Sequence, residues 1–269
     1  MLAVCATPIG NLDDVTLRVL HELAEADVVL CEDTRHTRKL LDRHGIRAKL
    51  LSYHEHNEAA RTAELLPRLQ AGERIALVSD AGLPAVSDPG ARLVQAALEG
   101  GVPVTVLPGA SAVDTALVAS GAAAERYQFL GFLPRGARAL TRIWDELGGW
   151  PWPAVAFESP KRLPATLRSL AAADPERDVA VCRELTKRHE EVVRGSAQEL
   201  AERFHEPPKG EITIVFEPGP GRPRVGADVK AASDAVRELV AAGISRRQAS
   251  EVVGRLIGLP RKRLYDMSL

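Results

Sequence analysis

Short apolar runs alternate with amphipathic stretches along the first half of the chain. The apolar runs, each the length of a typical strand, are Leu2–Ala6, Asp27–Cys31, Lys49–Tyr53, Arg74–Ser79 and Pro103–Leu107. Between them apolar residues recur at helical spacing, as in Thr16–Glu25, Glu58–Gln70 and Ala91–Leu98. A strand-then-helix rhythm of this kind predicts a parallel sheet that is covered by helices on both faces.

A second series of apolar runs follows from residue 128 onward. Its predicted strands are Gln128–Phe132, Ala154–Phe157, Asp178–Arg183, Glu191–Arg194 and Glu211–Phe216, and its predicted helices are Leu140–Leu147, Leu163–Ala172 and Ala197–Phe204. Asp178–Arg183 and Glu191–Arg194 lie too close in sequence for a crossover helix, which predicts that these two strands pair antiparallel. The second half should therefore hold a mixed sheet, unlike the first.

The chain ends in a segment of different character. Pro218–Arg224 has the Pro/Gly composition of a linker, and helical patterns follow at Ala231–Ala242, Ser245–Leu256 and from Arg261 onward. We therefore expect an α/β protein with two unlike α/β domains, residues 1–121 and 122–218, and a small helical tail over residues 225–269.

Composition narrows the class of protein. The 269 residues are 45% hydrophobic and 26% charged, as in a soluble globular protein, and the net charge of -1 excludes a chain that is basic throughout. From Arg222 to Leu269, however, 10 Lys and Arg face 5 Asp and Glu, a net charge of +5. The tail is thus a basic appendage on an acidic body.

Cysteine usage and hydropathy indicate the compartment. Cys5, Cys31 and Cys182 stand far apart inside apolar runs, which is typical of buried free thiols in a reducing environment. The sequence has no run of about 18 apolar residues and no signal-peptide pattern. We expect a cytoplasmic protein that does not enter the membrane.

Every predicted strand of the first half leads into a small, polar or charged loop. These loops are Thr7–Leu12, Glu32–Thr37, His54–Asn57, Ser79–Gly90 and Pro108–Ala112. Because ligands of open α/β sheets bind beyond the carboxyl ends of the strands, five such loops indicate one shared cleft. Its small residues, Gly10, Ala81, Gly82, Gly90, Gly109 and Ala110, would let the backbone approach a ligand closely.

Common nucleotide and metal motifs do not account for these loops. Neither Gly-x-Gly-x-x-Gly nor the P-loop pattern occurs, which disfavours dinucleotide and nucleoside triphosphate sites of those kinds. Asp80 and Asp88 have no accompanying His or Cys cluster, and His54 with His56 lacks an obvious third zinc ligand. We expect no bound metal.

Taken together, the motifs resemble those of a known family. They are Ala6–Leu12, Glu32–Arg35, Ser79–Pro84, Ser87–Gly90, Pro108–Ala112, Gly131–Pro134, Glu158–Arg162, Arg183–Lys187 and Lys209–Glu211. In this order the chain resembles the ribosomal-RNA-modifying branch of the tetrapyrrole methylase superfamily, over about residues 3–217 and more weakly through the tail. One departure is Leu83, where the family usually carries Thr.

The resemblance implies a fold and a cofactor. It implies two unlike α/β domains with S-adenosylmethionine bound in the cleft between them, and a homodimer. It assigns Ser79, Asp80 and Ala81 to the methionine half of the cofactor with Gly82 and Pro84 in the same loop. The remaining implied contacts are Pro8 and Gly10 after the first strand, the backbone amides of Ser111 and Ala112, and Glu158 and Gly195 near the adenosine.

The resemblance also implies the reaction, which is 2'-O-methylation of a cytidine in the decoding region of small-subunit (16S) ribosomal RNA. A ribose hydroxyl is a poor nucleophile until its proton begins to leave, so a general base is expected. The loop candidates are Glu32, Asp33, Glu55, Glu184 and Lys187. Glu32 is the first candidate base and Asp33 the second, and Lys187 is also a candidate for holding the oxyanion or a phosphate. Candidate RNA contacts are Arg35, Arg135, Arg246, Arg247, Arg261 and Lys262.

Two other functions are consistent with such a fold. One is C-methylation of a tetrapyrrole, although such enzymes usually open with a Gly-x-Gly-x-Gly-Asp type segment instead of Thr7–Asn11 and lack the basic tail. The other is a non-catalytic RNA-binding assembly factor, which the intact loops disfavour. The substrate of the favoured function is either free ribosomal RNA or the assembled small subunit.

Overall fold

The computed structural model of the chain describes residues 1–86, 88–122, 124–218, 229–257, 264–265 and 268. The chain divides into two compact units, Met1–Thr115 with Glu184–Glu190, and Ala116–Arg183 with Glu191–Leu269. The first division falls inside a helix, and Glu184–Glu190 joins the first unit although its neighbours in sequence belong to the second. The domains expected at residues 1–121 and 122–218 stay a prediction.

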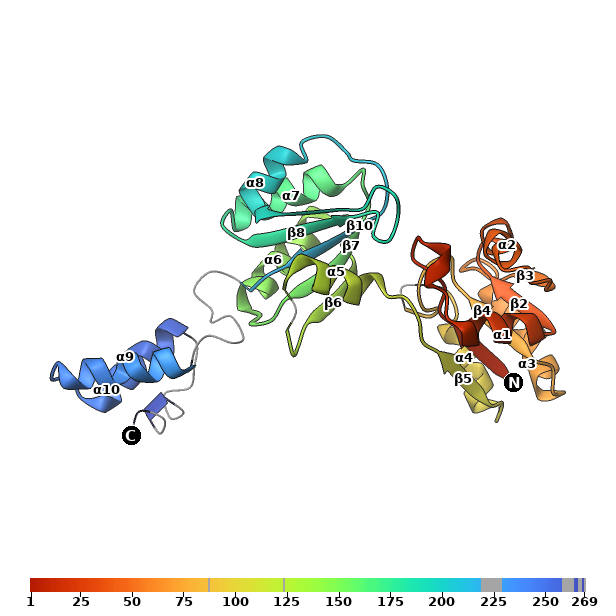
Figure 1. The fold of residues 1–269 in the computed structure, drawn as a ribbon, viewed down its shortest axis with the longest axis horizontal. Helices are drawn as coiled ribbons and strands as arrows, with labels where there is room; N and C mark the ends of the chain where they lie inside the picture. Colours follow the sequence, from red (N-terminus) through yellow and green to blue (C-terminus); the bar gives the residue numbers. More distant parts are fainter. Residues whose placement is uncertain (87, 123, 219–228, 258–263, 266–267, 269) are drawn as a thin grey trace. The chain divides into compact units, whose positions relative to one another are not determined.

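The first unit contains the predicted parallel sheet. Its strands are β1 (Leu2–Cys5), β2 (Val28–Cys31), β3 (Leu50–Ser52), β4 (Ile75–Val78) and β5 (Val104–Leu107), in the order β3-β2-β4-β1-β5 (Figure 1). All the pairings are parallel. Each strand lies within one of the predicted apolar runs, so the expectation from the hydrophobic pattern is confirmed.

Helices cover both faces of this sheet. They are α1 (Leu17–Glu25), α2 (Thr34–Arg43), α3 (Glu58–Gln70) and α4 (Ala91–Glu99), with a 3-10 turn at Leu12–Asp14. The next helix, α5 (Ala112–Ser120), crosses the division between the two units. Leu2 and Val4 point into a core with α3 and α4, whereas Ala3 and Cys5 point into a core with α1 and α2. The side chains of one strand thus alternate between two cores, which explains why the strands read as continuous apolar runs.

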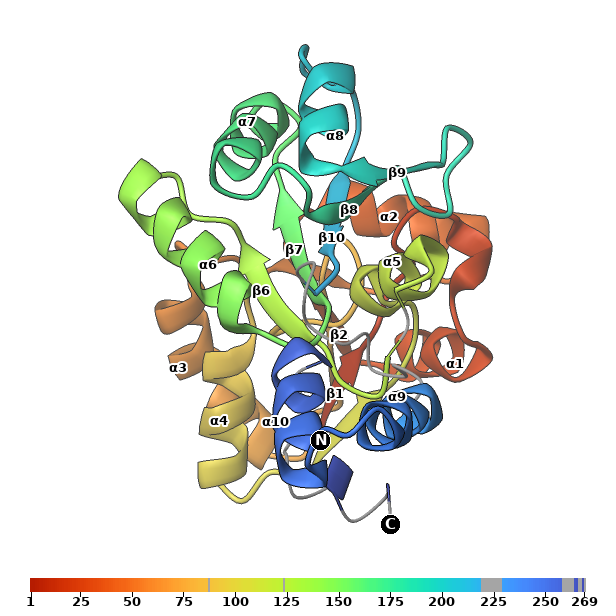
Figure 2. The same cartoon turned by 90° about the vertical axis from the view of Figure 1, so that its left-hand side faces the viewer.

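The second unit has the expected mixed sheet. Its strands are β6 (Gln128–Phe132), β7 (Ala154–Glu158), β8 (Asp178–Arg183), β9 (Glu191–Ser196) and β10 (Ile212–Phe216), in the order β6-β7-β10-β8-β9. β6 pairs parallel with β7, and the remaining pairs, including β8 with β9, are antiparallel. Figure 2 shows α6 running beside β6. α6 (Ala137–Gly149), α7 (Leu163–Ala173) and α8 (Ala197–Arg203) supply one large apolar core on this sheet.

The tail forms two helices, α9 (Val229–Ala241) and α10 (Arg246–Ile257). Ala232 and Val236 of α9 pack with Ala249 and Val253 of α10 and with Leu264 in a small apolar cluster of their own. Both helices were expected from the sequence. The linker expected at Pro218–Arg224 and the third helix from Arg261 fall almost wholly outside the described residues.

Two further expectations concern cysteines and membranes. Cys5, Cys31 and Cys182 are free thiols and are buried, as predicted. Burial raises the pKa of the Cys5 thiol to about 12, which keeps it protonated and unreactive at neutral pH. Within the described residues, none of the helices combines the length and the hydropathy that a membrane span requires.

Candidate functional site

The loops after β1 and β4 are joined by backbone hydrogen bonds at the carboxyl edge of the first sheet. Thr7 N–H donates to the carbonyl of Gly82 (2.8 Å), and Gly82 N–H donates to that of Thr7 (3.1 Å), in an isolated antiparallel bridge. The Thr7 hydroxyl donates to the carbonyl of Ser79 (3.0 Å), and the Ser79 hydroxyl to that of Gly82 (3.1 Å). The predicted cofactor loop is therefore fixed from within and from β1, so that its backbone shape is set before any ligand binds.

Three carboxylates gather around this loop from two strand ends. Burial and the negative charges of Glu32 and Asp80 raise the pKa of Asp88 to about 6. Partial desolvation and the charge of Asp80 also raise the pKa of Glu32, against a lowering contribution from His54. Glu32 and Asp80 were predicted site residues, whereas Asp88 was considered only as a metal ligand. Within the described residues no group of His, Cys, Asp and Glu side chains has an arrangement that could hold a metal ion.

Asp33 has a different environment from its neighbour Glu32. Its carboxylate caps the N-terminus of α2, where Arg35 donates from its backbone N–H (2.8 Å), Nε (3.3 Å) and Nη2 (3.1 Å). These hydrogen bonds lower the pKa of Asp33 to about 2, which makes it a weak base. Asp33 N–H itself donates to the Asp80 carboxylate (3.2 Å). The predicted loop Glu32–Thr37 is thus shorter than expected, because α2 begins at Thr34.

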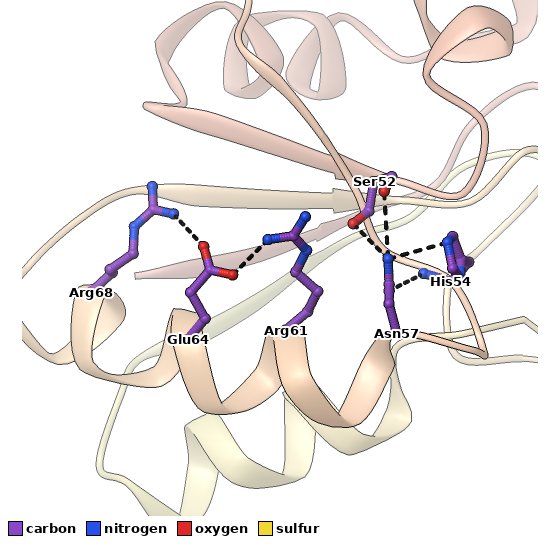
Figure 3. A network of polar contacts seen from close by, with 6 residues as sticks. All are labelled: Ser52, His54, Asn57, Arg61, Glu64 and Arg68. Atoms are coloured by element: carbon purple, nitrogen blue, oxygen red, sulfur yellow. Dashed lines mark hydrogen bonds and ion pairs between the residues drawn. The ribbon is translucent and has the colours of Figure 1, made fainter.

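The segment after β3 is held by a polar network (Figure 3). Asn57 accepts from the backbone N–H of His54 (2.9 Å), and its amide donates to the Ser52 carbonyl (3.2 Å) and faces His54 Nε2 (3.2 Å). Because this amide donates to Nε2, the proton of the neutral ring lies on Nδ1. His54 Nδ1 is buried and has no hydrogen-bond partner within the described part of the chain. The network fixes a histidine beside the acidic cluster, and neither its tautomer nor its orientation could be read from the sequence.

Gly10 and Lys187 lie side by side, although they are far apart in sequence. A Cβ at Gly10 would lie 2.5 Å from Lys187 Cγ and 2.9 Å from the Leu185 carbonyl oxygen. Asn11 N–H donates to the Thr186 hydroxyl (3.0 Å), and Lys187 Nζ pairs with Glu184 at 3.0 Å. A glycine at position 10 is therefore required by the close approach of Glu184–Glu190. This loop brings Lys187 into the first unit, a juxtaposition that sequence patterns did not reveal.

An open depression of about 580 Å³ lies where the loop after β1 meets Glu184–Glu190. It is lined by Gly10–Asp13, Arg43 and Thr186–Arg188. Two of these lining residues, Arg43 and Asp13, form an ion pair at 3.0 Å. The depression is basic on balance, which is consistent with the assignment of Lys187 to a phosphate or an oxyanion.

The remaining predicted cofactor residues of the first unit are at the expected strand ends. Pro8 and Pro84 are buried, and Ala81 is exposed. Leu83, which stands where the family usually has Thr, packs against the apolar core that contains Leu2 and Leu77. Ser111 precedes α5, and its hydroxyl accepts from Asp114 N–H (3.3 Å). The backbone amides of Ser111 and Ala112 thus lie at the N-terminal end of a helix.

Glu158 and Gly195 belong to the second unit. The Glu158 side chain is fully buried and accepts from Thr166 Oγ1 (2.6 Å), Arg162 Nη2 (2.9 Å) and Ser159 N–H (2.7 Å). A carboxylate with that many donors is a structural anchor, which leaves only its backbone for a cofactor. Gly195 faces the Glu199 side chain, whose oxygen would lie 2.9 Å from an added Cβ.

The side chains predicted to contact RNA differ in exposure and in the partners that they already have. Arg35 is held by Asp33, so much of its charge is already neutralised. Arg246 donates to the Ser268 carbonyl (2.6 Å), whereas Arg135 and Arg247 are exposed. Arg261 and Lys262 lie outside the described residues.

The residues at the carboxyl edge suit S-adenosylmethionine. Its sulfonium cation would be stabilised by the negative potential of Glu32, Asp80 and Asp88. Burial and the repulsion between these carboxylates raise the pKa values of Glu32 and Asp88. The small residues of the bridged loop leave backbone groups accessible to the polar groups of the methionine moiety. Both features are properties of the first unit alone.

Comparison with known proteins indicates the same family as the sequence motifs. The model of the tetrapyrrole (corrin/porphyrin) methylases matches residues 1–201. A Synechocystis protein named "Ribosomal RNA small subunit methyltransferase I" is 43% identical over 271 residues, covering 100% of this chain and 97% of that protein. A Thermotoga maritima protein of the same name is 43% identical over 216 residues, covering 80% of this chain and 97% of that protein.

Among solved structures, a uroporphyrin-III C-methyltransferase from Thermus thermophilus, complexed with S-adenyl homocysteine, has a TM-score of 0.56. The match covers 80% of this chain and 96% of that one, at 20% identity. At this identity the likeness concerns the fold alone.

The acidic cluster should make stability depend on pH in an unusual direction. Because the pKa of Asp88 is raised in the folded state, from an ordinary 3.8 to about 6, the folded protein holds this proton more tightly than the unfolded chain does. Stability should therefore fall as pH rises from about 4 to 6. Asp88→Asn should raise the free energy of unfolding by about 1–2 kcal/mol at pH 7.5, after allowance for solvent screening of a partly exposed group.

Urea unfolding at pH 4 and pH 7.5 measures this effect. Asp145→Asn on the exposed side of α6 is the control and should change neither value. A gain for Asp88→Asn that is equal at both pH values would contradict the electrostatic explanation.

Proposed function

The chain belongs to the tetrapyrrole methylase family, and with that membership as the premise we propose that it methylates ribosomal RNA with S-adenosylmethionine as the methyl donor. The observation that carries this function is 43% identity, over the full length of the chain, to a protein named for the same activity. The finer part of the proposal is the 2'-oxygen of a cytidine in the decoding region of the small-subunit RNA.

The proposed chemistry is a direct displacement. Bound S-adenosylmethionine supplies an electrophilic methyl group on a sulfonium. The ribose oxygen forms the new O–CH3 bond as the S–CH3 bond breaks, and the hydroxyl proton leaves to a base on the protein. The protein therefore has to position the hydroxyl and accept one proton.

Glu32 is the better of the two proposed bases. Its pKa is raised by partial desolvation and Asp80, whereas the pKa of Asp33 is lowered to about 2 by Arg35. A carboxylate with the higher pKa accepts a proton more readily. Lys187, at 3.0 Å from Glu184 Oε1, is proposed to hold a phosphate or the developing oxyanion.

The cofactor is proposed to bind to the bridged loop and its neighbours. Ser79, Asp80, Ala81 and Gly82 are assigned to the methionine half, because Thr7 and the Ser79 hydroxyl fix their backbone in one shape. The nearby residues Pro8, Gly10, Pro84, Ser111 and Ala112 are proposed to complete the contacts of the first unit. Glu158 and Gly195 are proposed to contact the adenosine through backbone groups.

Tetrapyrrole C-methylation is the weaker alternative. The solved C-methyltransferase is 20% identical, whereas the relatives named for ribosomal RNA are about twice as similar in sequence. A non-catalytic assembly factor would have no need of a raised-pKa carboxylate at the strand edge. Neither alternative has an observation in its favour that the RNA methyltransferase lacks.

Small-subunit specificity, a homodimer and a cytoplasmic location also stay proposals. A dimer is supported by exposed apolar side chains beside the free edge strand β5, since Leu17 is 83% exposed and Val106 is 51% exposed. A cytoplasmic location is supported by the ribosomal substrate.

The function is tested by methyl transfer from labelled S-adenosylmethionine to small subunits isolated from a strain that lacks the protein. Label should appear in the RNA and, after nuclease digestion, on the 2'-oxygen of one cytidine. Free ribosomal RNA, tested in parallel, distinguishes the two forms of the substrate. Label in a tetrapyrrole and none in RNA would contradict the proposal.

The same assay tests the base. Glu32→Gln keeps the shape and removes the basic carboxylate, so turnover should fall roughly 10²- to 10⁴-fold while cofactor affinity barely changes. Asp33→Asn should have a much smaller effect on turnover, because this carboxylate caps α2. A larger loss for Asp33→Asn than for Glu32→Gln would transfer the role to Asp33.

The tail is proposed to bind RNA phosphates. Arg247 is exposed on α10, so Arg247→Gln should weaken RNA binding without lowering the melting temperature. The plot of log affinity against log salt should become shallower by about 0.7–0.9 for one lost phosphate contact.

The matched control is Arg237→Gln on α9. Its guanidinium is already paired with Asp234 at 2.9 Å, so the salt slope should not change. Equal effects of both substitutions would show a general charge effect and no specific contact.

A further inference from the structure

Strand β6 carries a bulge that changes the direction of one aromatic side chain. Phe129 pairs with Val155 and Phe132 with Phe157, so β6 uses one more residue than β7 between the two pairs. Gly131, inside the bulge, has a φ of +65°, which favours glycine. Side chains of a regular strand alternate, and Phe132 would then share the face of Leu130, which packs on the core. The bulge instead brings Phe132 to the face of Phe129.

The turned ring is exposed and yet firmly supported. Phe132 is 62% exposed. Its ring meets Phe157 edge-on, with centroids 5.5 Å apart and planes at 61°, and Phe157 in turn meets Phe129 at 5.0 Å and 68°. A row of three rings therefore holds Phe132 in one orientation, which reduces the entropy lost when a further ring stacks on it.

The loop that follows is anchored and presents cations. Leu133 N–H donates to the Phe157 carbonyl (3.1 Å), and Arg162 donates to the Leu133 carbonyl (2.6 Å) while it pairs with the buried Glu158. Arg135 and Arg138, next along this loop and at the start of α6, are exposed. Neither forms an ion pair with another residue in the described part of the chain. An oriented aromatic ring is thus followed directly by two uncompensated charges.

We propose that Phe132 is a stacking platform for an unpaired base of the RNA substrate, with Arg135 and Arg138 binding the flanking phosphates. Aromatic rings beside arginines recognise single-stranded RNA because every base offers a π-face and every nucleotide a negative charge. The exposed positive charges of Arg135 and Arg138 favour the binding of a polyanion beside Phe132 over the binding of an apolar protein surface. This inference rests on the proposed RNA methyltransferase function and adds to it the contact that holds a base.

The test is the binding of a short fluorescein-labelled single-stranded RNA to the full chain, with and without one abasic position at its centre. Phe132→Ala should weaken binding of the intact RNA about 5- to 150-fold, the range for loss of one stacked base. The abasic RNA should bind the parent protein with a similar loss, and Phe132→Ala should cause little further loss with it. This non-additivity identifies the ring and the base as partners.

Two more substitutions separate stacking from simple apolar burial. Phe132→Tyr keeps an aromatic face and should retain affinity, whereas Phe132→Leu keeps apolar area and should bind nearly as weakly as Phe132→Ala. Val118→Ala is the matched control, since Val118 is also in the second unit and 70% exposed, and RNA affinity should not change. S-adenosylmethionine affinity, measured by calorimetry, should be equal in all the variants.

Full affinity in Phe132→Leu would overturn the proposal and indicate that the ring is buried against another protein surface, including a second copy of the chain. Additive losses from the abasic RNA and Phe132→Ala would also overturn it. Methyl transfer by the parent protein is measured separately. If the parent protein methylates RNA but the two losses of affinity are additive, the stacking is refuted and the proposed function stands. If the losses are non-additive but no methyl group is transferred to RNA, the proposed function is refuted and the stacking stands.

Discussion

The parallel pairing of β1 with both β4 and β5 is the constraint on which the first unit depends. It places the ends of these strands at one edge of the sheet, Cys5 beside Val78 and Leu107, so that three loops start next to one another. The Thr7–Gly82 bridge then extends the pairing of the β1 and β4 segments beyond the sheet. Buried, doubly covered strands make this arrangement rigid, and the loops inherit that rigidity.

The carboxylates at this edge of the sheet repel one another, which lowers the free energy of unfolding, and their negative potential favours a bound cation. Asp80 follows β4 and Glu32 follows β2. Burial, together with the negative charges of these two residues, raises the pKa of Asp88 to about 6. Asp33, next to Glu32, has the opposite environment because Arg35 neutralises it. Two adjacent carboxylates in the sequence thus acquire different proton affinities, which is why Glu32 and not Asp33 is the preferred base in the proposed reaction.

In the second unit, a buried ion pair has a structural effect. Arg162 and Thr166 satisfy the Glu158 carboxylate inside the protein, and the same arginine fixes the backbone of Leu133. The loop after β6 is therefore held in place by a buried ion pair. The bulge at Gly131 and this anchor together decide where Phe132 and the arginines that follow it are presented.

The sequence by itself determined the strands, nearly all of the helices and the polar loops at the strand ends, because the period of apolar residues depends on local geometry and on which faces are buried. It missed α2, since the polar run Thr34–Lys39 looks like a loop until Asp33 is seen to cap it. Only the tertiary structure distinguished Glu32 from Asp33, brought Lys187 beside Gly10 and turned Phe132 outward. A proton affinity depends on charges supplied by other strands, a contact on loops distant in sequence, and the face of a side chain on a register that one extra residue reverses.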